Sequence, residues 1–340
     1  MTRAERYKAA GVDLDAADQA KRRIAEAVAS TRTGLARGGI GAFGGMIRLP
    51  QGVEQPTLVM STDGVGTKIL VAIRAGRHDT VGEDLVNHCV NDILVHGATP
   101  VAFLDYLAVA DVDTETIAAI VEGLARACCA HDMTLAGGET AQLPEMYQPG
   151  HYDLAGTIVG VVSEQSALHG DAVVVGDVLV GYASSGLHTN GYTLARRIVF
   201  DELGLDVDSD MPGMGATVGD VLLQVHRSYW QAIAPVLSRM HALAHVTGGG
   251  IPGNLSRSLP DGCGAVVRRS AWPVPGVFPL LQDAGRVTAD EMYQVFNMGL
   301  GMIGVVPCDK VAEVRQAADG AGVGTWPVGE IVAGDGVRIE

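Results

Sequence analysis

The chain has few aromatic residues, few cations and no long basic run. Phe, Trp and Tyr make up 5% of its 340 residues, so Ala, Val, Leu and Gly must build the core. Lys and Arg number 24 against 39 Asp and Glu, which gives a formal net charge of −15. A nucleic-acid groove is not expected on such a chain. An anionic substrate would need local backbone amides, a few cations or Mg²⁺.

Cysteines are also scarce, and long apolar runs are missing. The five cysteines are odd in number and form no CxxC pair. This predicts reduced thiols in a cytoplasmic protein, not a disulfide scaffold or a zinc site. No apolar run approaches the ~18 residues of a membrane-spanning helix. The polar N-terminus lacks the apolar core of a signal peptide, so we expect no membrane partner.

The patterning that is present predicts a mixed α/β chain of about two domains. Strands are expected at Pro56–Met60 and Val101–Ala110, and amphipathic helices at Asp79–His96 and Thr114–His131. Another strand, Asp177–Ala183, opens a second half. We therefore predict an N-terminal domain at 1–168 and a C-terminal domain at 169–340.

The stretch from Ser61 to Tyr106 carries the strongest chemical signal. Asp63 lies in the turn DGVGTK directly after a strand, followed by Thr67 and Lys68, and Asp92 lies in the next helix. Backbone amides, an ammonium and carboxylates near one point suit a metal-bound polyphosphate. A tight turn with a capping Asp is the alternative. The turn also lacks the GxxxxGK[ST] spacing of a P-loop.

Two further glycine-rich turns precede the second half. The segment Gly38–Gly45 contains five glycines in eight residues, which lets the backbone approach a ligand or another chain. A flexible hairpin is the alternative there. Glu139 follows Gly137 and Gly138 at the end of a short strand. If the fold brings Asp63, Asp92 and Glu139 together, they would form an oxygen-rich Mg²⁺ site.

In the second half, polar loops follow two strands. The segment SSGLHTNG, residues 184–191, lies at a strand-to-helix junction and is typical of a phosphate and sugar pocket. An ordinary capped turn is the alternative, as is a loop-holding hydrogen bond for His188. The segment His245–Pro252 is a third glycine-rich turn with a polar residue in front.

Taken in order, eight motifs resemble the aminoimidazole ribonucleotide (AIR) synthetase, or phosphoribosylformylglycinamidine cyclo-ligase, family. The resemblance covers nearly the whole chain. The motifs are YKAAGVD, GGIGAFGG, STDGVGTK, DLVNHCVNDILVHGATPVAFLDY, LAGGETAQLPEMY, SSGLHTNGYTLAR, HVTGGGIPGNL and FNMGLGM.

This resemblance implies a two-domain α+β fold, with an N-terminal sheet that pairs across a homodimer and a C-terminal α/β sandwich. It implies ATP-dependent cyclisation of formylglycinamidine ribonucleotide to 5-aminoimidazole ribonucleotide in purine biosynthesis, with ATP and Mg²⁺ as cofactors. Asp63, Lys68, Asp92 and His188 would be catalytic. Asp63, Asp92 and Glu139 would hold the metal.

The binding residues that the resemblance implies fall into two sets. ATP would contact Gly38, Gly39, Gly41, Phe43, Gly44, Gly45, Asp63, Gly64, Thr67, Lys68, Asp92, Gly137, Gly138, Glu139 and Thr140. The ribonucleotide substrate would contact Ser184, Ser185, Gly186, His188, Thr189, Asn190, His245, Thr247, Gly248 and Gly249.

The chain departs from the family pattern after its GGET motif, where GGETAEMPGMY reads GGETAQLPEMY. Related ATP-dependent enzymes, selenophosphate synthetase and thiamine-monophosphate kinase, have Asp where His245 stands. They also place an Asp pair in the loop that matches Gly38–Gly45. A different enzyme of that superfamily, or a nucleotide-sensing protein that has lost catalysis, are the rival interpretations.

Overall fold

The structure is a computed structural model that describes residues 14–37, 43–111 and 113–340. Its four-stranded sheet has the order β3-β6-β4-β5 and is built from β3 (Pro56–Gly64), β4 (Thr99–Val109), β5 (Thr134–Gln142) and β6 (Tyr152–Ser163). β6 is antiparallel to both β3 and β4, whereas β4 and β5 are parallel. A two-stranded hairpin, β1 (Ala36–Arg37) and β2 (Met46–Ile47), precedes this sheet.

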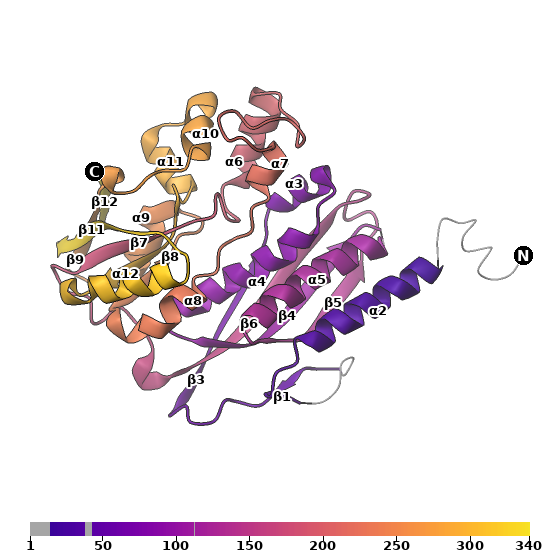
Figure 1. Cartoon of the computed structure of the whole chain (residues 1–340), viewed down its shortest axis with the longest axis horizontal. Helices are drawn as coiled ribbons and strands as arrows, with labels where there is room; N and C mark the ends of the chain where they lie inside the picture. Colours follow the sequence, from indigo (N-terminus) through magenta and orange to yellow (C-terminus); the bar gives the residue numbers. More distant parts are fainter. Residues whose placement is uncertain (1–13, 38–42, 112) are drawn as a thin grey trace, which may run out of the picture.

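Helices cover one face of this sheet. They are α2 (Leu14–Ser30), α4 (Asp79–Leu94) and α5 (Thr114–Ala130), while α3 (Lys68–Ala75) packs against α4. In α4, Val81, Leu85, Cys89 and Ile93 recur at helical spacing and are fully buried. Helix α4 packs on β3 and β6, α5 packs on α4, and α2 packs outside α5 (Figure 1).

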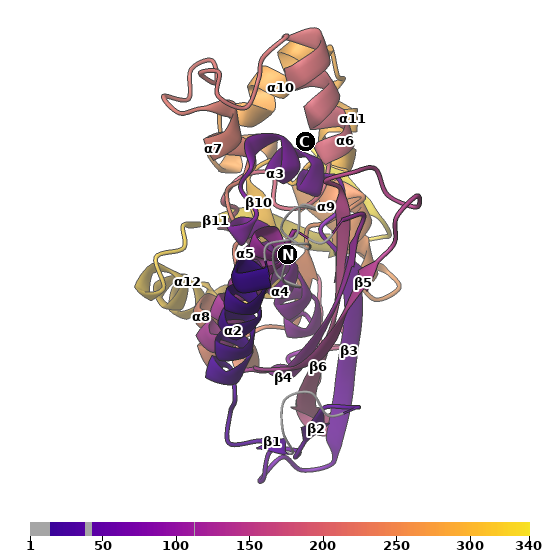
Figure 2. The same cartoon turned by 90° about the vertical axis from the view of Figure 1, so that its right-hand side faces the viewer.

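The opposite face of the four-stranded sheet carries no helix among the described residues (Figure 2). Leu58 and Met60 on β3 and Leu104 and Tyr106 on β4 are exposed there. Met60 pairs with Val159, and Thr62 pairs with Thr157, which in turn pairs with Leu104. This register places the four exposed positions on the same side of the pleated sheet. The uncovered face is therefore partly apolar.

The second half forms a six-stranded sheet. Its order is β12-β9-β11-β7-β10-β8, with β7 (Val178–Ala183), β8 (Ala242–His245), β9 (Cys263–Val267), β10 (Leu300–Val306), β11 (Thr325–Ala333) and β12 (Val337–Ile339). All neighbours are antiparallel except β12 and β9. Every residue of β10 is buried, as expected for a strand covered on both faces.

The helices of this half are α6 (Tyr192–Arg196), α7 (Val218–Leu222), α8 (Trp230–Ile233), α9 (Gly250–Leu255), α10 (Val277–Gly285), α11 (Ala289–Val295) and α12 (Val311–Gly320). Helix α12 contacts β7 and β11, and α9 contacts β8 and β12. A π-helical segment, Arg197–Glu202, extends α6. The predicted two-part α+β fold is confirmed.

One segment of this half is not built from regular helix or strand. Between α7 and α8, residues 223–229 are not helical, and a 3₁₀ segment, Ala234–Arg239, follows α8. The chain at residues 223–229 supplies backbone groups to the site described below, and those tertiary contacts override local propensity.

The two halves share one core. A single cluster of buried apolar side chains contains Val65 and Leu85 from the first half and Leu187, Tyr192 and Ile251 from the second. Helix α4 contacts both α8 and β8. Polar residues on the second-half side of α4 therefore meet residues that lie more than 100 positions away in the sequence.

Candidate functional site at the junction of the two halves

Two of the predicted carboxylates come together where the halves meet. Asp63 lies at the end of β3, Asp92 on α4 and His245 at the end of β8. One carboxylate oxygen of Asp63 is 2.8 Å from His88 Nε2, and Asp92 Oδ2 is 3.7 Å from the same atom. Asp92 Oδ1 lies 2.8 Å from His245 Nδ1. We call these four residues the Asp–His centre.

Helix periodicity explains why α4 contributes so much. Residues four apart lie on the same face of a helix, so His88 and Asp92 share one side of α4, and Asn87 and Asn91 lie beside them. Asn91 has no exposed surface, and Asp92 accepts a hydrogen bond from Ser61 Oγ at 3.0 Å. These tertiary hydrogen bonds account for two poor helix formers near the end of the helix.

A second layer of histidines surrounds the centre. His226 Nε2 is 3.1 Å from His245 Nε2, and Thr189 Oγ1 is 2.8 Å from His88 Nδ1 and 3.3 Å from His226 Nδ1. The His188 ring stacks on His226 with 4.0 Å between ring centroids. Four imidazoles, one hydroxyl and two carboxylates thus form one contiguous network.

Burial and ion pairing act in opposite directions on the pKa values of this network. Burial alone would raise the pKa of Asp63, but its contact with His88 holds that pKa below the usual value. Burial would also raise the pKa of Asp92, but its contact with His245 holds that pKa below the usual value. Although burial disfavours charge, Asp63 and Asp92 raise the pKa of His88, whereas burial lowers that of His245.

Lys68 does not occupy the predicted position at an open phosphate site. Its side chain has 0% exposed surface, and its ammonium lies 2.8 Å from both oxygens of Asp84 and 2.6 Å from the Gln224 carbonyl oxygen. Burial lowers the pKa of Lys68 and raises that of Asp84, and their ion pair opposes both shifts. Direct contact of Lys68 with phosphate is therefore an expectation that the structure contradicts. The charge of Lys68 instead compensates that of Asp84.

His188 is also enclosed, with 1% of its surface exposed. Its Nε2 accepts a hydrogen bond from the Ser185 amide at 3.2 Å, and its backbone has a φ of 64°. Direct contact with a ribonucleotide is not available to a side chain in this position. The geometry instead favours the loop-holding alternative for His188.

The remaining predicted substrate residues line the same junction. Ser184 and Ser185 donate to the carbonyl oxygens of Gly186 and Val225, and Thr247 donates to Asn254. Asn190 lies beside the Gly248–Gly249 turn, since its Oδ1 is 3.4 Å from the place where a Cβ on Gly248 would stand. Across the junction, Thr67 Oγ1 is 3.1 Å from Thr193 Oγ1, which brings the Gly64–Thr67 turn next to these loops.

Glu139 does not join the other two acids within one chain. It lies on β5, at the opposite edge of the sheet from β3, so that three strand spacings, about 14 Å, separate Glu139 from Asp63. Among the described residues, the groups with metal-ligand spacing are His88–Asp92–His245 and His188–His226–His245. The predicted set of three carboxylates is therefore corrected to Asp63 and Asp92 with two histidines.

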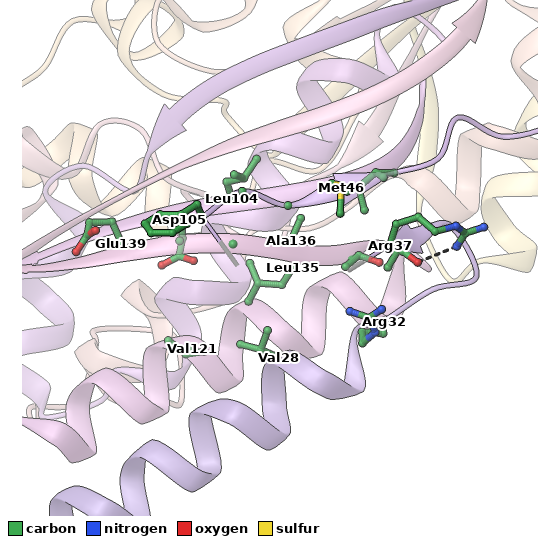
Figure 3. A pocket seen from close by; sticks show the side chains of 18 of the residues that line it. Val28, Arg32, Arg37, Met46, Leu104, Asp105, Val121, Leu135, Ala136 and Glu139 are labelled. Carbon is green, nitrogen blue, oxygen red and sulfur yellow. Dashed lines mark hydrogen bonds between the residues drawn. The ribbon is translucent and has the colours of Figure 1, made fainter. Parts of the chain in front are cut away.

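A separate pocket of about 500 Å³ lies at the β5 edge (Figure 3). Predicted ATP-binding residues line it: Phe43, Gly44, Gly45, Gly137, Gly138, Glu139 and Thr140. Its other walls are Val28 of α2, Val121 of α5 and the hairpin β1–β2. Gly38, Gly39 and Gly41, and the motif YKAAGVD, lie outside the described residues. The structure thus divides the predicted ATP set between two regions.

Asp105 of β4 lines this β5 pocket and had no predicted role. The residue follows Leu104 in the motif FLDY, and among the described residues no other side chain forms a hydrogen bond or an ion pair with it. Burial raises its pKa to about 6. A Cβ on Gly138 would lie 2.2 Å from Asp105 Oδ1, so the glycine gives this carboxyl its space.

Sequence reasoning also missed His226, Asp84 and His88. His88 and Asp84 lie on α4 at positions whose burial depends on the second half, which local periodicity does not reveal. His226 lies in the non-helical segment between α7 and α8. The spacing of His88 and Asp92, four residues apart on a helix, was the one available signal for the pair.

One departure from the family pattern has a visible backbone consequence. Glu145 replaces a glycine of the pattern GGETAEMPGMY and adopts a φ of 71°. This left-handed conformation is easy for glycine and costs about 1 kcal/mol for most other residues. The loop after β5 therefore retains the conformation that the pattern's glycine would favour.

The donor set of the Asp–His centre fits a divalent cation. His88, Asp92 and His245 offer ligand atoms that all lie within 4.8 Å of one another, and the Asp63 carboxylate lies 2.8 Å from His88 Nε2. Carboxylate oxygens suit Mg²⁺, and imidazole nitrogens suit transition metals. Asp63 and Asp92 are thus the residues that would hold a metal–nucleotide complex here.

Comparison with known proteins gives consistent results over nearly the whole chain. Residues 41–162 match the family described as AIR synthase related protein, N-terminal domain, and residues 174–340 match its C-terminal domain. The phosphoribosylformylglycinamidine cyclo-ligase of Geobacter sulfurreducens is 46% identical over 328 residues, which cover 96% of this chain and 94% of that protein. The corresponding protein of Myxococcus xanthus is 46% identical over 333 residues, 97% of this chain and 96% of that protein.

Solved structures of similar shape are more distant in sequence. The crystal structure of thiamine-monophosphate kinase from Stenotrophomonas maltophilia superimposes with a TM-score of 0.69, covers 95% of both chains and is 18% identical. At this identity the likeness concerns the fold alone.

Proposed function

Since the chain belongs to the phosphoribosylformylglycinamidine cyclo-ligase family and is a ligase of purine biosynthesis, we propose that its Asp–His centre serves the ATP-dependent closure of the imidazole ring. The substrate is formylglycinamidine ribonucleotide, and the products are 5-aminoimidazole ribonucleotide, ADP and phosphate. The observation that carries the proposal is the convergence of Asp63, Asp92, His245 and the 184–193 loop at one junction.

The chemistry needs positioning and charge neutralisation more than covalent participation by the protein. The formyl amide oxygen is a poor leaving group, so transfer of a phosphoryl group from ATP activates it. The amidine nitrogen then attacks the activated carbon, and phosphate leaves. Asp63 and Asp92 would hold Mg²⁺, which would supply charge neutralisation at the phosphates. The amides of the Gly64–Thr67 turn provide further donors for phosphate oxygens.

The two enclosed groups, Lys68 and His188, act in this proposal through other residues. Lys68 holds Asp84, and Asp84 accepts the His226 amide at 2.7 Å, so this pair fixes the segment that carries His226. His188 supports the same ring from the other side by stacking. Both are positioning residues that keep the Asp–His centre in one geometry.

The β5 pocket is proposed to take part of a nucleotide. It combines predicted glycine-rich contacts with apolar walls and lies away from the Asp–His centre, so the two regions bind different groups. Arg32 and Arg37 also line the pocket and add positive charge to a strongly acidic chain.

The direct test is turnover. Purified protein is incubated with ATP, Mg²⁺ and formylglycinamidine ribonucleotide, and ADP and the aminoimidazole product are followed together. Formation of both in equal amounts is expected. ATP consumption that requires thiamine monophosphate or selenide instead would assign the chain to a rival enzyme of the superfamily. Nucleotide binding without any turnover would favour a sensing protein.

We also propose that the protein is a cytoplasmic homodimer. The uncovered, partly apolar face of the four-stranded sheet supports pairing of two chains, since Met60 is 64% and Leu104 is 37% exposed. Light scattering should give twice the chain mass. Leu104→Glu should yield monomers, whereas Val175→Glu, at an exposed valine of the second half, should leave the dimer intact. A monomeric unmodified protein would contradict the pairing.

A further inference from the structure

A second, smaller cavity of about 130 Å³ lies where the two halves of the chain are joined. Its walls come from the end of α4, the connecting residues 168–170, the start of β8 and the 3₁₀ turn Ser256–Ser258 that follows α9. Among the described residues, none from the Asp–His centre or the β5 pocket lines it. The two halves therefore enclose a space that the proposed chemistry does not use.

Close packing and hydrogen bonds hold the walls of this cavity in place. The Leu168 amide donates to the His96 carbonyl oxygen at 3.2 Å, which ties the connecting residues to the end of α4. Gly170 has a φ of 86°, and a Cβ there would lie 2.6 Å from the Ser258 carbonyl oxygen, so glycine is required for this approach. Ser258 Oγ in turn donates to the Leu243 carbonyl oxygen at 2.7 Å. The cavity is therefore preformed, and a ligand would bind with little reorganisation.

The mouth of the cavity is basic, and its floor is apolar. His96, His169 and Arg257 are exposed, whereas Ala242 and Leu243 are buried. Within the described ranges, no hydrogen bond or ion pair engages the side chains of the two histidines and the arginine, and no acidic residue lines the cavity. On a chain with a net charge of −15, three unpaired basic side chains around one hollow favour an anion.

The partial negative charge at the C-terminal end of α4 does not cancel this preference. The carbonyl oxygens of Asn91, Ile93 and Leu94 accept hydrogen bonds from the amides of residues 95–98 at distances between 2.8 and 3.3 Å. These bonds cap the end of the helix. The guanidinium and the imidazoles are therefore the groups that determine the charge at the mouth.

The size of the cavity limits what it can bind. A volume of about 130 Å³ is the share of roughly four water molecules in the liquid, and pockets that enclose a drug-sized ligand have ~300–1,000 Å³. A phosphoryl group, which is one phosphorus atom with its oxygens, is of the smaller size. A guanidinium can donate two parallel hydrogen bonds to such a group, and each imidazole can donate at least one.

We propose that this cavity is an anion-binding site that takes a phosphoryl group, either of free phosphate or of a phosphate monoester whose remainder extends into solvent. His96 of the first half and His169 and Arg257 of the second would donate to the same oxyanion. A bound group would fasten α4 to the second half, at the contact of α4 with β8 on which the Asp–His centre also depends. The site is independent of the proposed function and would stand if ring closure were disproved.

The first test observes the two histidines directly. The protein is labelled with ¹³Cε1-histidine, and inorganic phosphate is added at constant pH and ionic strength while ¹H–¹³C spectra are recorded. His96→Gln and His169→Gln assign the two signals. Both signals should shift along one saturating curve, with a dissociation constant on the order of 1 mM or lower. Signals that do not move, or that chloride at equal ionic strength moves equally, would overturn the proposal.

A matched pair of variants tests the arginine. Arg257→Gln should weaken phosphate binding, read from the His96 signal, at least about tenfold, because it removes charge-assisted hydrogen bonds. Arg286→Gln is the control, since it removes the same charge at the end of α10, away from the cavity. Equal affinities in the two variants would contradict the proposal. The spectrum of each variant also shows whether it is folded.

Thermal unfolding gives an independent measurement and separates specific binding from a salt effect. Phosphate should raise the Tm of the unmodified protein more than that of Arg257→Gln, because a ligand that binds only the folded chain stabilises it. Phosphate also stabilises proteins without binding, so an equal rise in both would overturn the proposal. Ribose 5-phosphate is compared with inorganic phosphate to identify the source of the phosphoryl group. Tighter binding of either one supports the site and names its ligand class.

Discussion

The two candidate binding regions are built in opposite ways. At the Asp–His centre each acid has a partner, because His88 meets Asp63 and His245 meets Asp92 at 2.8 Å. In the β5 pocket, Asp105 is largely buried, and burial raises its pKa to about 6. The first region joins two halves of the chain, and the second lies at the edge of one sheet (Figure 3).

This difference separates two uses of a buried carboxyl group. Paired acids keep their charge at neutral pH and suit the binding of a cation. An acid without a partner is held closer to neutrality, where it can donate as well as accept a hydrogen bond. The centre is therefore suited to charge neutralisation, and the pocket to recognition of a polar group on an otherwise apolar surface.

The largest expected effect concerns the ion pair that supports the centre. Lys68→Met should lower the free energy of unfolding by about 3–5 kcal/mol, because it leaves Asp84 buried without a compensating charge. Urea unfolding measures this loss. The double variant Lys68→Met/Asp84→Leu should recover part of it. A single variant as stable as the unmodified protein would mean that Lys68 is not enclosed, and would restore phosphate contact as its role.

Asp92→Asn should reduce turnover while leaving the protein folded. Removing one metal-binding carboxylate is expected to lower kcat about 10²- to 10³-fold, since metal-assisted charge stabilisation is worth several kcal/mol. Steady-state assays of ADP release measure the change. Asp105→Asn is the matched variant in the other region and should reduce turnover less. Equal losses in the two variants would remove the distinction between the regions.

The sequence located two acids of the centre correctly, but it did not show which other residues belong to the centre and which do not. Turn motifs and helical spacing located Asp63 and Asp92 because both are local signals. Glu139 was grouped with them because its GGET turn looks like the DGVGTK turn. Strand order, which decides that β3 and β5 lie at opposite edges, is a long-range property that neither turn contains. Likewise the role of Lys68 depended on Asp84 and Gln224, one of which lies 156 residues away.

The raised pKa of Asp105 predicts how the stability of the protein depends on pH. Its pKa is raised from 3.8 to about 6, so the neutral acid is favoured in the folded state. The resulting stabilisation is present below about pH 4 and is lost as the pH rises through about 6. Asp105→Asn removes the charged form. It should therefore gain stability over the unmodified protein with increasing pH, reaching about 1–3 kcal/mol at pH 7.5.

Urea unfolding of both proteins at several pH values between 4 and 7.5 tests this dependence. A constant difference across that range would show that Asp105 titrates normally and that the pocket is open to water. Asp63→Asn serves as the contrast from the Asp–His centre. The pKa of Asp63 is lowered by its contact with His88, so its ionised form is favoured in the folded state. The stability that this charge contributes is present above about pH 4 and is lost only at lower pH, on the other side of the range in which Asp105 acts.

The smallest expected effect tests how tightly the β5 pocket holds Asp105. In Gly138→Ala the new methyl group would lie 2.2 Å from Asp105 Oδ1 and 2.8 Å from its Cγ, so the carboxyl group must rotate. A loss of about 1 kcal/mol in the free energy of unfolding is expected, since crowding of this kind is partly relieved by side-chain movement. Thermal unfolding measures it.

Gly137→Ala is the control for this crowding, because its Cβ would be 3.9 Å from Leu104 and in ordinary contact. Its stability should change by less than about 0.5 kcal/mol. In an Asp105→Ala background the cost of Gly138→Ala should largely disappear, since the colliding group is gone. If Gly138→Ala lowers the free energy of unfolding equally in that background, then the backbone of β5, and not the Asp105 side chain, crowds the methyl group. The unpaired carboxyl of the pocket would then be free to move, unlike the paired acids at the junction.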